Sequence, residues 1–527
     1  MTENQNEVFF FDYASSSLKE LTSTPSLPSI VSGLNSFNTW KKSANFSDIP
    51  IESLENSLNQ LDVSLNLTKY NPDQISQISA LLSQALLPLL QDGEWIWYEG
   101  EFTKALNNKY KQQNQFVLKG VPPLLVVAIH WIKYLQQAGA EIDKYAGVIK
   151  SLLCYTVDSS YPWSVKDKAK LYAALTTLIN EITAPIPNFY ELLLARIKPV
   201  FVQHSTHPSV SSAGRRVMTS DDTVRSLFFE ELDRKENPNS WRTKNQYALG
   251  LLEVYLANSQ SSQVQSNWSF LLPCVLNIVD DHDPAIKRKG SDLVYLLVTR
   301  SERNFLVNTG VVPLLWKALK PNLAYLPPST PASISIPLTK STYKASVALS
   351  DTSSTPYKLQ EEYLQDAVLS GISHTHTHTK SLVTFINITS DLVLNHLKSY
   401  TTPHLKSLVA IVVGTLSDPL VTFSEELVIA ACNLSESLIR VCWYRIVVYR
   451  YDLVKALILI SRRLANGNPP ELINHGRKIV DLLIQAAQIN IESTEKIPGI
   501  DNFASELSQL AEKEPTFRLF LPDPSLK

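Results

Sequence analysis

Apolar residues recur at spacings of three and four along most of the chain, and that spacing places them on one face of an α-helix. The clearest run follows residue 70 and consists of Ile75, Ile78, Leu82, Leu86 and Leu89. The Asn71-Pro72 pair before it is typical of an N-cap followed by proline at the first helical position. Ser164 precedes a second run over 171–182, and we predict that it caps that helix. Strand-like alternation is nearly absent, so the pattern predicts an all-α fold.

The same pattern divides the chain into four parts. Residues 1–70 are polar and weakly periodic, so we expect a partly ordered N-terminal region with short helices. Residues 71–325 have strong helical periodicity and form a predicted helical-repeat region. Residues 326–359 are rich in proline, serine and threonine and lack a helical stripe, which predicts a flexible insertion. Helical periodicity returns over 360–527, the predicted C-terminal helical region.

The acidic segment Asp-Asp-His-Asp at 280–283 lies between two apolar runs and suggests either a metal or acid–base site or a turn. Asp283 can accept the first free N–H groups of the following helix, and Pro284 has no N–H to leave unpaired. Asp280 and Asp281 would end the preceding helix. Adjacent residues of one turn point in different directions, which suits metal ligands poorly. We therefore predict a helix-to-helix turn with solvated carboxylates.

This turn pattern recurs elsewhere in the chain. His207-Pro208 is followed by Gly214 at the same distance that separates Pro284 from Gly290, and Asp418-Pro419 begins a weaker copy without the glycine. The spacing from Pro208 to Pro284 is close to two helical hairpins of about 40 residues each. A helical hairpin cannot bury its apolar face alone, so repetition over this length predicts a stacked α-solenoid.

Composition and charge exclude several classes of protein. Apolar residues make up 44% and charged residues 19% of 527 residues, as expected of a globular chain. A formal net charge of −2 argues against a nucleic-acid binder that neutralises phosphates. The four cysteines form no C-x-x-C pair, which predicts reduced thiols in a cytoplasmic or nuclear protein. The most apolar stretch, 441–460, carries too many charges for a lipid-facing helix, so we expect no membrane span.

Catalytic and metal-binding signatures are missing. The glycine spacings exclude G-x-G-x-x-G, G-x-S-x-G and the standard P-loop, and no H-E-x-x-H occurs. The tract at 374–379, His-Thr-His-Thr-His-Thr, would line one face with histidines if it were extended and could then bind Zn²⁺ or Cu²⁺ weakly; we prefer a solvated loop. We expect no enzyme, no cofactor and no metal site.

Several aromatic and basic residues are candidates for binding a partner. Trp241 and Arg242 follow an Asn-Pro turn and are of the types that dominate interface hot spots, although Trp241 can equally anchor the core. The cluster 95–98, Trp-Ile-Trp-Tyr, has the same two interpretations. The segment 442–451, which contains Trp443 and Tyr444, is either a buried helix or a docking helix.

Basic residues stand where the second helices of two pairs are predicted to start. On a solenoid such helices line one face, so these residues would form either a basic strip for an acidic partner or an ordinary solvated face. They are Arg215, Arg216, Lys287, Arg288 and Lys289.

The helical hairpins resemble known repeats. The D-x-D-P-x-I-K segment that ends at Lys287, with a small residue inside the second helix, is similar to a HEAT repeat. The segment 310–315 resembles an armadillo repeat. Over 237–297 the pattern resembles the family of the second Tel-two-interacting protein. It comprises Trp241-Arg242, Trp268, a leucine–proline helix, the acidic turn, Lys287, and Gly290 entering an apolar helix. The resemblance is strong over about 200–320 and weaker outside it.

The resemblance implies a HEAT/armadillo-like scaffold without enzyme activity, the smallest subunit of the TTT co-chaperone complex. Members of that family bind the larger Tel-two-interacting HEAT subunit and the Tel-two subunit. With the ninety-kilodalton heat-shock chaperone, the complex supports maturation of phosphatidylinositol-kinase-related kinases, and telomere maintenance follows indirectly. The alternative is another HEAT/armadillo adaptor, such as a transport or cargo adaptor, which would show regular repeats along the whole chain.

Overall fold

A computed structural model describes most of the chain as helices. The described residues are 27–42, 58, 60–62, 64–65, 69–88, 121–161, 163–204, 206–216, 241, 245–463, 470–491 and 500–521. Within these ranges every regular element is a helix, apart from an isolated β-bridge between Val210 and Arg216. The chain forms two compact units, an N-terminal unit of 1–281 with 299–302 and a C-terminal unit of 282–298 with 303–527.

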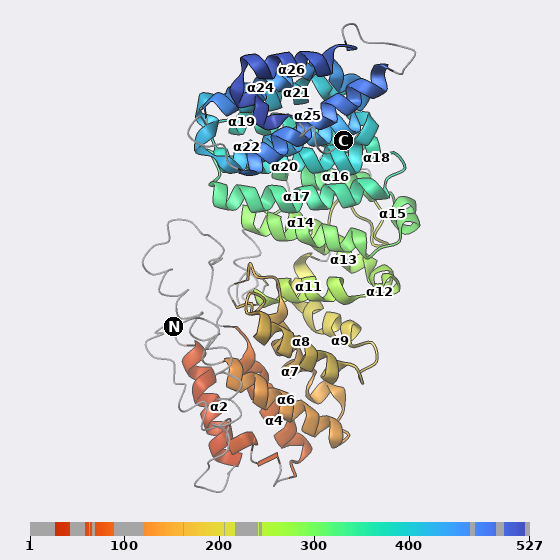
Figure 1. Ribbon diagram of the computed structural model, residues 1–527. Helices are drawn as coiled ribbons and strands as arrows, with labels where there is room; N and C mark the ends of the chain where they lie inside the picture. Colours follow the sequence, from red (N-terminus) through yellow and green to blue (C-terminus); the bar gives the residue numbers. More distant parts are fainter. Residues whose placement is uncertain are drawn as a thin grey trace, which may run out of the picture. The chain divides into compact units, whose positions relative to one another are not determined.

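Short to medium helices build the N-terminal unit (Figure 1). Its α-helices are α2 (Leu27–Lys42), α4 (Pro72–Leu86), α6 (Val121–Gln137), α7 (Ala146–Leu153), α8 (Ala169–Thr183), α9 (Phe189–Ile197), α11 (Tyr247–Asn258), α12 (Ser261–Ser266) and α13 (Trp268–Val279). Its 3₁₀ turns are η2 (Ile142–Lys144), η3 (Cys154–Thr156) and η4 (Lys198–His204).

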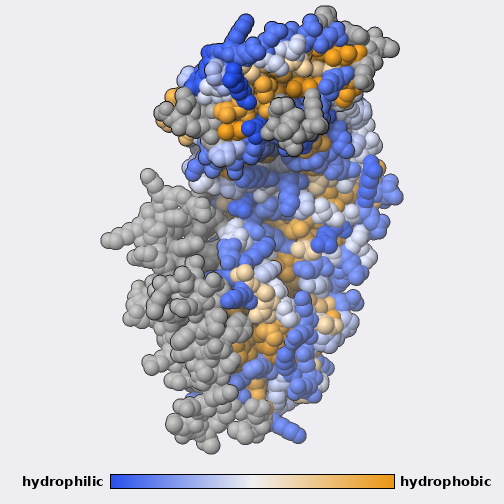
Figure 2. Space-filling model, in the orientation of Figure 1, coloured by the Kyte–Doolittle hydropathy of each residue, from blue (hydrophilic) through white to orange (hydrophobic). Residues whose placement is uncertain are grey.

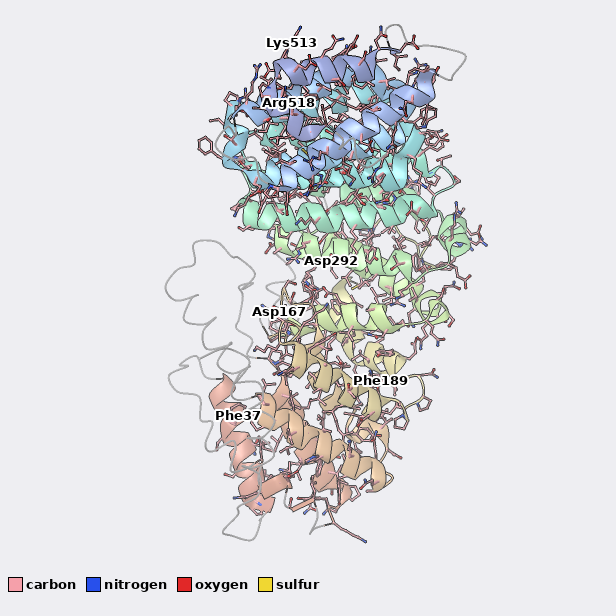
Figure 3. The ribbon with its side chains drawn as sticks, viewed as in Figure 1. Phe37, Asp167, Phe189, Asp292, Lys513 and Arg518 are labelled. Atoms are coloured by element: carbon pink, nitrogen blue, oxygen red, sulfur yellow. The ribbon has the colours of Figure 1, made fainter. Side chains whose placement is uncertain are left out.

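Helix α4 forms as the sequence predicts. The Asn71 side chain accepts from the Gln74 N–H at 2.9 Å, and the Gln74 side chain accepts from the Asn71 N–H at 3.0 Å, which completes a capping box. The apolar face of α4 is buried, and α4 packs against α2, α6 and α7. Phe37 of α2 and Phe189 of α9 are buried in the same unit (Figure 3).

The C-terminal unit combines helices of 21 and 22 residues with several of eight residues or fewer. Its α-helices are α14 (Pro284–Thr299), α15 (Arg303–Thr309), α16 (Val312–Leu319), α17 (Ala332–Thr352), α18 (Pro356–Tyr363), α19 (Ser370–Thr375), α20 (Thr379–Asp391), α21 (Leu405–Ser417), α22 (Glu425–Val441), α23 (Trp443–Ile446), α24 (Arg450–Arg463), α25 (Pro470–Ile491) and α26 (Phe503–Lys513). The 3₁₀ turns are η5 (Lys320–Ala324), η8 (Lys398–His404), η9 (Pro419–Phe423), η10 (Val447–Tyr449) and η11 (Pro515–Phe520), and two π-helical turns are η6 (Leu364–Leu369) and η7 (Leu392–Leu397).

Helices of the C-terminal unit stack in two rows. In one row α17 packs on α20, α20 on α22 and α22 on α25, and in the other α21 packs on α24 (Figure 1). Each hairpin contacts its neighbours in the sequence, as in a solenoid whose core grows by stacking. The fold is therefore the all-α, HEAT/armadillo-like α-solenoid that the hydrophobic pattern and the resemblance predicted.

The predicted flexible insertion at 326–359 is wrong, because most of it is the 21-residue helix α17. Its buried face is built largely from small hydroxyl residues, including Ser335, Thr339, Thr342 and Ser346. Small side chains permit close packing, and the Thr342 hydroxyl lies 3.3 Å from that of Ser291 on α14. The hydrophobic pattern of the sequence did not reveal this buried face, because serine and threonine are not counted as apolar residues.

Two predictions about helix starts are also wrong. Ser164 does not cap a helix; its hydroxyl accepts from the Lys166 N–H, and α8 begins later, at Ala169. The segment from His207 to Gly214 is not a second copy of the helix-to-helix turn. It forms consecutive turns closed by the Val210–Arg216 bridge, with Gly214 at a φ of +70°.

Candidate interaction surface

The acidic turn at 280–283 connects helices, as predicted. Asp280 follows the last residue of α13, and the Asp283 carboxylate accepts from the Ala285 N–H at 2.8 Å in the first turn of α14. One detail differs from the prediction, because Asp281 is buried rather than solvated, with 1% of its surface exposed. Within the described ranges no three His, Cys, Asp or Glu residues are grouped so that they could hold a metal ion.

Asp280 also holds the loop 206–216 against α13 in the N-terminal unit. The Ser209 N–H donates to Nδ1 of His207 at 3.2 Å, so Nε2 carries the ring hydrogen and donates to Asp280 at 3.1 Å. The Asn277 side chain donates to the Thr206 carbonyl at 2.9 Å. At the first residue of α13, the indole N–H of Trp268 donates to the Gly214 carbonyl at 2.8 Å. These polar contacts fix a loop that has no apolar stripe of its own.

Trp241 is a core residue, which is one of the two interpretations that its sequence context allowed. Its side chain is fully buried and stacks on Phe201, with ring centroids 6.1 Å apart. It therefore offers no surface to a partner. Arg242 and the aromatic cluster at 95–98 lie outside the described residues.

Two of the basic residues fit neither interpretation of the sequence, an exposed basic strip or an ordinary solvated face. Lys287 and Lys289 are buried, with 5% and 3% of their surfaces exposed, and Arg288 is half-buried. The Lys287 ammonium lies 5.7 Å from the ring centre of Tyr325, a cation–π contact that helps to satisfy a buried charge. Arg215 and Arg216 are exposed but lie in the turn that ends at the β-bridge, not at the start of a helix.

The histidine tract is not extended but spans the end of one helix, a short turn and the start of the next. His374 lies in α19, His376 follows its last residue, and His378 precedes α20, so the three side chains do not line one face. Nδ1 of His376 lies 2.9 Å from the Ser373 carbonyl, a local contact at the helix end. His376 and His378 lie in the short turn between α19 and α20, where residues 376 and 377 are exposed, in agreement with the solvated loop that we preferred.

The four cysteines are buried free thiols. Burial raises the pKa of Cys432 to about 12, and the nearby Glu436 carboxylate adds to the shift. Burial also raises the pKa of Cys274 and of Cys442. Thiolates are the reactive form of cysteine, so these side chains are suited to packing rather than to nucleophilic chemistry.

The segment around Trp443 and Tyr444 combines both interpretations of the sequence. Ile446 and Val447 are buried, whereas Trp443 has 41% and Val448 has 54% of its surface exposed. Trp443 packs edge-on against Tyr444, which is half-buried. This segment is therefore a core helix whose outer side presents aromatic and aliphatic surface to solvent.

Two further exposed apolar residues were not identified from the sequence. Leu420 and Phe423 in η9 have 69% and 87% of their surfaces exposed. The Asp418 carboxylate accepts from the Leu420 N–H at 2.9 Å, so this Asp-Pro pair caps a 3₁₀ turn and not the following α-helix. The available signal was a short proline-started turn with several apolar residues, of which only Val421 is buried among Leu420, Val421 and Phe423.

Ion pairs of Glu436 join helices α22 and α25 in the C-terminal unit. This buried carboxylate lies 2.6 Å from Nδ1 of His475 and 2.6 Å from the Lys478 ammonium, and Arg440 approaches it at 3.5 Å. The contacts join the two helices next to the α23 segment, which follows α22 directly. A buried charge held by several donors favours one packing arrangement.

No individual helix in the described part of the chain is both long and apolar enough to cross a membrane. The helices Glu425–Val441 and Trp443–Arg463 are long and apolar enough only when taken together, and the chain bends by 108° between them. Both helices of this pair contribute buried residues to the core of the C-terminal unit.

Comparison with known proteins gives a family and several distant folds. The Tti2 family model matches residues 148–423. Among solved structures, the chain is similar to Kap121p (12% identity over 97% of this chain and 54% of that one, TM-score 0.38). It is also similar to Kap121p bound to Pho4p (10% identity, 96% and 58%, TM-score 0.35). The chain spans little more than half the length of these karyopherin chains.

Proposed function

The chain belongs to the Tti2 family, and from this membership we propose that it is a non-enzymatic scaffold subunit of the TTT co-chaperone complex. The observation that carries the proposal is the match over 148–423, which extends from α7 to η9 and includes helices of both compact units. This family and a helical solenoid are typical of scaffolds without catalytic activity.

Its proposed partners are the larger Tel-two-interacting HEAT subunit and the Tel-two subunit. Together with the ninety-kilodalton heat-shock chaperone, the complex would support folding, assembly and stability of phosphatidylinositol-kinase-related kinases in the cytoplasm and nucleus. No direct contact with nucleic acid or membrane is part of the proposal. The exposed aromatic and aliphatic residues of the C-terminal unit support a protein-binding role.

Affinity purification of the tagged chain from its own cells tests the proposal. We expect both companion subunits in similar amounts and kinase clients at lower levels. Recovery of a small GTPase with transport cargo would instead support the alternative of a transport adaptor, and recovery of neither companion subunit would overturn the proposal.

A further inference from the structure

The helix running from Trp443 to Arg463 has two different apolar sides. Its inner side packs into the core of the C-terminal unit through Leu453, Val454, Leu457 and Ile460. Its opposite side carries residues at spacings of three and four, which align along one helical face. These are Tyr444 in α23, Val448 in η10, and Tyr451, Lys455, Ile458 and Arg462 in α24, which we together call the α24 outer stripe.

The α24 outer stripe is accessible to solvent. Val448 and Tyr451 have 54% and 46% of their surfaces exposed, and Lys455 and Arg462 are also exposed. Figure 2 shows hydrophobic and hydrophilic residues side by side over the C-terminal helices. Ile458 packs partly against the core, whereas Val448 and Tyr451 stay exposed on the same face, and neighbouring exposed apolar side chains are typical of binding sites.

Tyr451, at the middle of the stripe, is held rigidly. The guanidinium of Arg450 lies 4.3 Å from its ring centre, and the ring of Phe503 on α26 packs edge-on at 5.9 Å. Its hydroxyl donates to Glu506 at 2.5 Å, and this hydrogen bond raises the pKa of Tyr451. An exposed aromatic residue that is already ordered loses little entropy on binding, as interface anchors require.

Charge on this helix favours an acidic partner. Its exposed cations are Arg445, Lys455, Arg462 and Arg463, whereas Asp452 is its exposed anion. Arg462 is paired with Glu514, and Arg463 donates to the Ser417 carbonyl. Among the residues that the structure describes, Arg445 and Lys455 have no carboxylate partner. On the flanking elements α26 and η11, Lys513 and Arg518 (Figure 3) are offset by Glu506, Glu512 and Glu514, so the positive charge comes from the Trp443–Arg463 helix itself.

We propose that the α24 outer stripe docks an acidic amphipathic helix of a partner protein. A stripe from 444 to 462 is about 27 Å long, enough for about 18 residues of a partner helix packed along α24. Apolar residues of that helix would contact Val448 and Tyr451, and its carboxylates would face Arg445 and Lys455. The proposal rests on the proposed function only in that a scaffold subunit needs such a surface.

An anionic membrane is the competing occupant, because basic amphipathic helices also bind lipid surfaces. Ile458 is half-buried, so little apolar surface is free to enter a bilayer beyond Val448 and Tyr451. This small apolar area favours a protein helix.

The test is a binding titration with the full chain. The probe is a fluorescein-labelled 18-residue peptide with leucine at helical spacings of three and four and glutamate elsewhere; a matched peptide has lysine in place of glutamate. The test variant is Val448→Glu, and its control is Val202→Glu, which changes a valine of similar exposure, 62%, in the N-terminal unit. Lys455→Glu serves as a second test variant that changes charge alone, should Val448→Glu unfold.

Fluorescence anisotropy should show the glutamate peptide binding to wild type and Val202→Glu about tenfold more tightly than to Val448→Glu or Lys455→Glu. The lysine peptide should bind weakly to all of them. Equal binding by wild type and both test variants, or a preference for the lysine peptide, overturns the proposal. Binding of phosphatidylserine vesicles without binding of the glutamate peptide overturns it in favour of a membrane.

A parallel purification from cells separates the two proposals. If wild type recovers the companion subunits and Val448→Glu recovers as much, the stripe is wrong as their docking site and the proposed function stands. If wild type recovers neither companion while the glutamate peptide binds as expected, the proposed function is wrong and the stripe stands.

Discussion

The two units differ in how many large apolar side chains they expose. Among the described residues of the N-terminal unit Val202 is exposed, whereas the C-terminal unit exposes such side chains at intervals from Val307 to Leu519. Two tryptophans show the contrast. Trp241 is fully buried against Phe201, but Trp443 has 41% of its surface exposed. Both stand close to an arginine in the sequence, at Arg242 and Arg445, so local composition does not distinguish them.

The difference arises from how each segment is held in place. In the N-terminal unit, Trp241 is enclosed in the core beside Phe201. In the C-terminal unit, the Trp443–Arg463 helix buries one side completely and leaves Trp443 at the edge of the core. A helix anchored by one side can expose apolar residues on the other without losing its place. We therefore expect substitutions in the N-terminal unit to affect stability and those on the outer side of this helix to affect binding.

The largest expected effect is that of Trp241→Ala. Removing a fully buried tryptophan should lower the free energy of unfolding by about 3–5 kcal/mol, because it leaves a cavity beside Phe201. Urea unfolding combined with hydrogen exchange of the α11 peptides would measure the loss. Normal stability with lost partner binding would contradict the assignment of Trp241 to the core.

The second largest effect is expected for Gly214→Ala, which should lower the free energy of unfolding by about 3 kcal/mol. The substitution strains a φ of +70° and places a methyl group 2.4 Å from Cδ1 of Trp268. Gly139→Ala is the matched control, because Gly139 has a φ of +67° but nothing within 4 Å, so strain alone should cost about 1 kcal/mol. Equal losses, measured by urea unfolding, would mean that contact with Trp268 does not matter.

The third prediction concerns alkaline pH and the C-terminal unit. Burial raises the pKa of Cys432 to about 12, whereas an unfolded thiol ionises near 8.5. Below pH 8.5 both states hold the proton and stability is unaffected; above it the unfolded state alone loses the proton, so stability falls as the pH rises towards 12. By pH 10 this thiol should contribute a loss of about 2 kcal/mol.

Cys432→Ala removes that contribution and serves as the comparison. Between pH 8 and pH 10, wild type should lose about 2 kcal/mol more than the variant in urea unfolding. Parallel pH dependence of the two proteins would show that Cys432 ionises normally in the folded chain.

Trp443→Ala should have the smallest effect on stability, below about 0.5 kcal/mol, because exposed side chains contribute little to folding. Compared with Trp241→Ala in the same urea titration, it tests the contrast between the two units directly. A loss similar to that of Trp241→Ala would show that the exposed tryptophan is structurally required and would remove the basis of the comparison.

Local sequence rules determined much of this fold. The spacing of apolar residues identified α4 and the helices on both sides of the acidic turn, and Asn71 and Asp283 cap their helices as short-range hydrogen bonding requires. These features depend on residues within about one helical turn of each other. The all-α solenoid follows from them, because amphipathic hairpins must stack to cover their apolar faces.

Tertiary structure alone decided which side chains are buried. The hydroxyl-rich face of α17 is buried by packing against other helices, with Thr342 beside Ser291 of α14. Lys287 is buried beside Tyr325 although its sequence context indicates a surface residue. Whether Trp241 or Trp443 is exposed depends on Phe201 and on the core beneath α23, which are distant from them in sequence or belong to other helices. Burial is a property of packing between elements, and a periodic pattern on one element cannot specify what covers it.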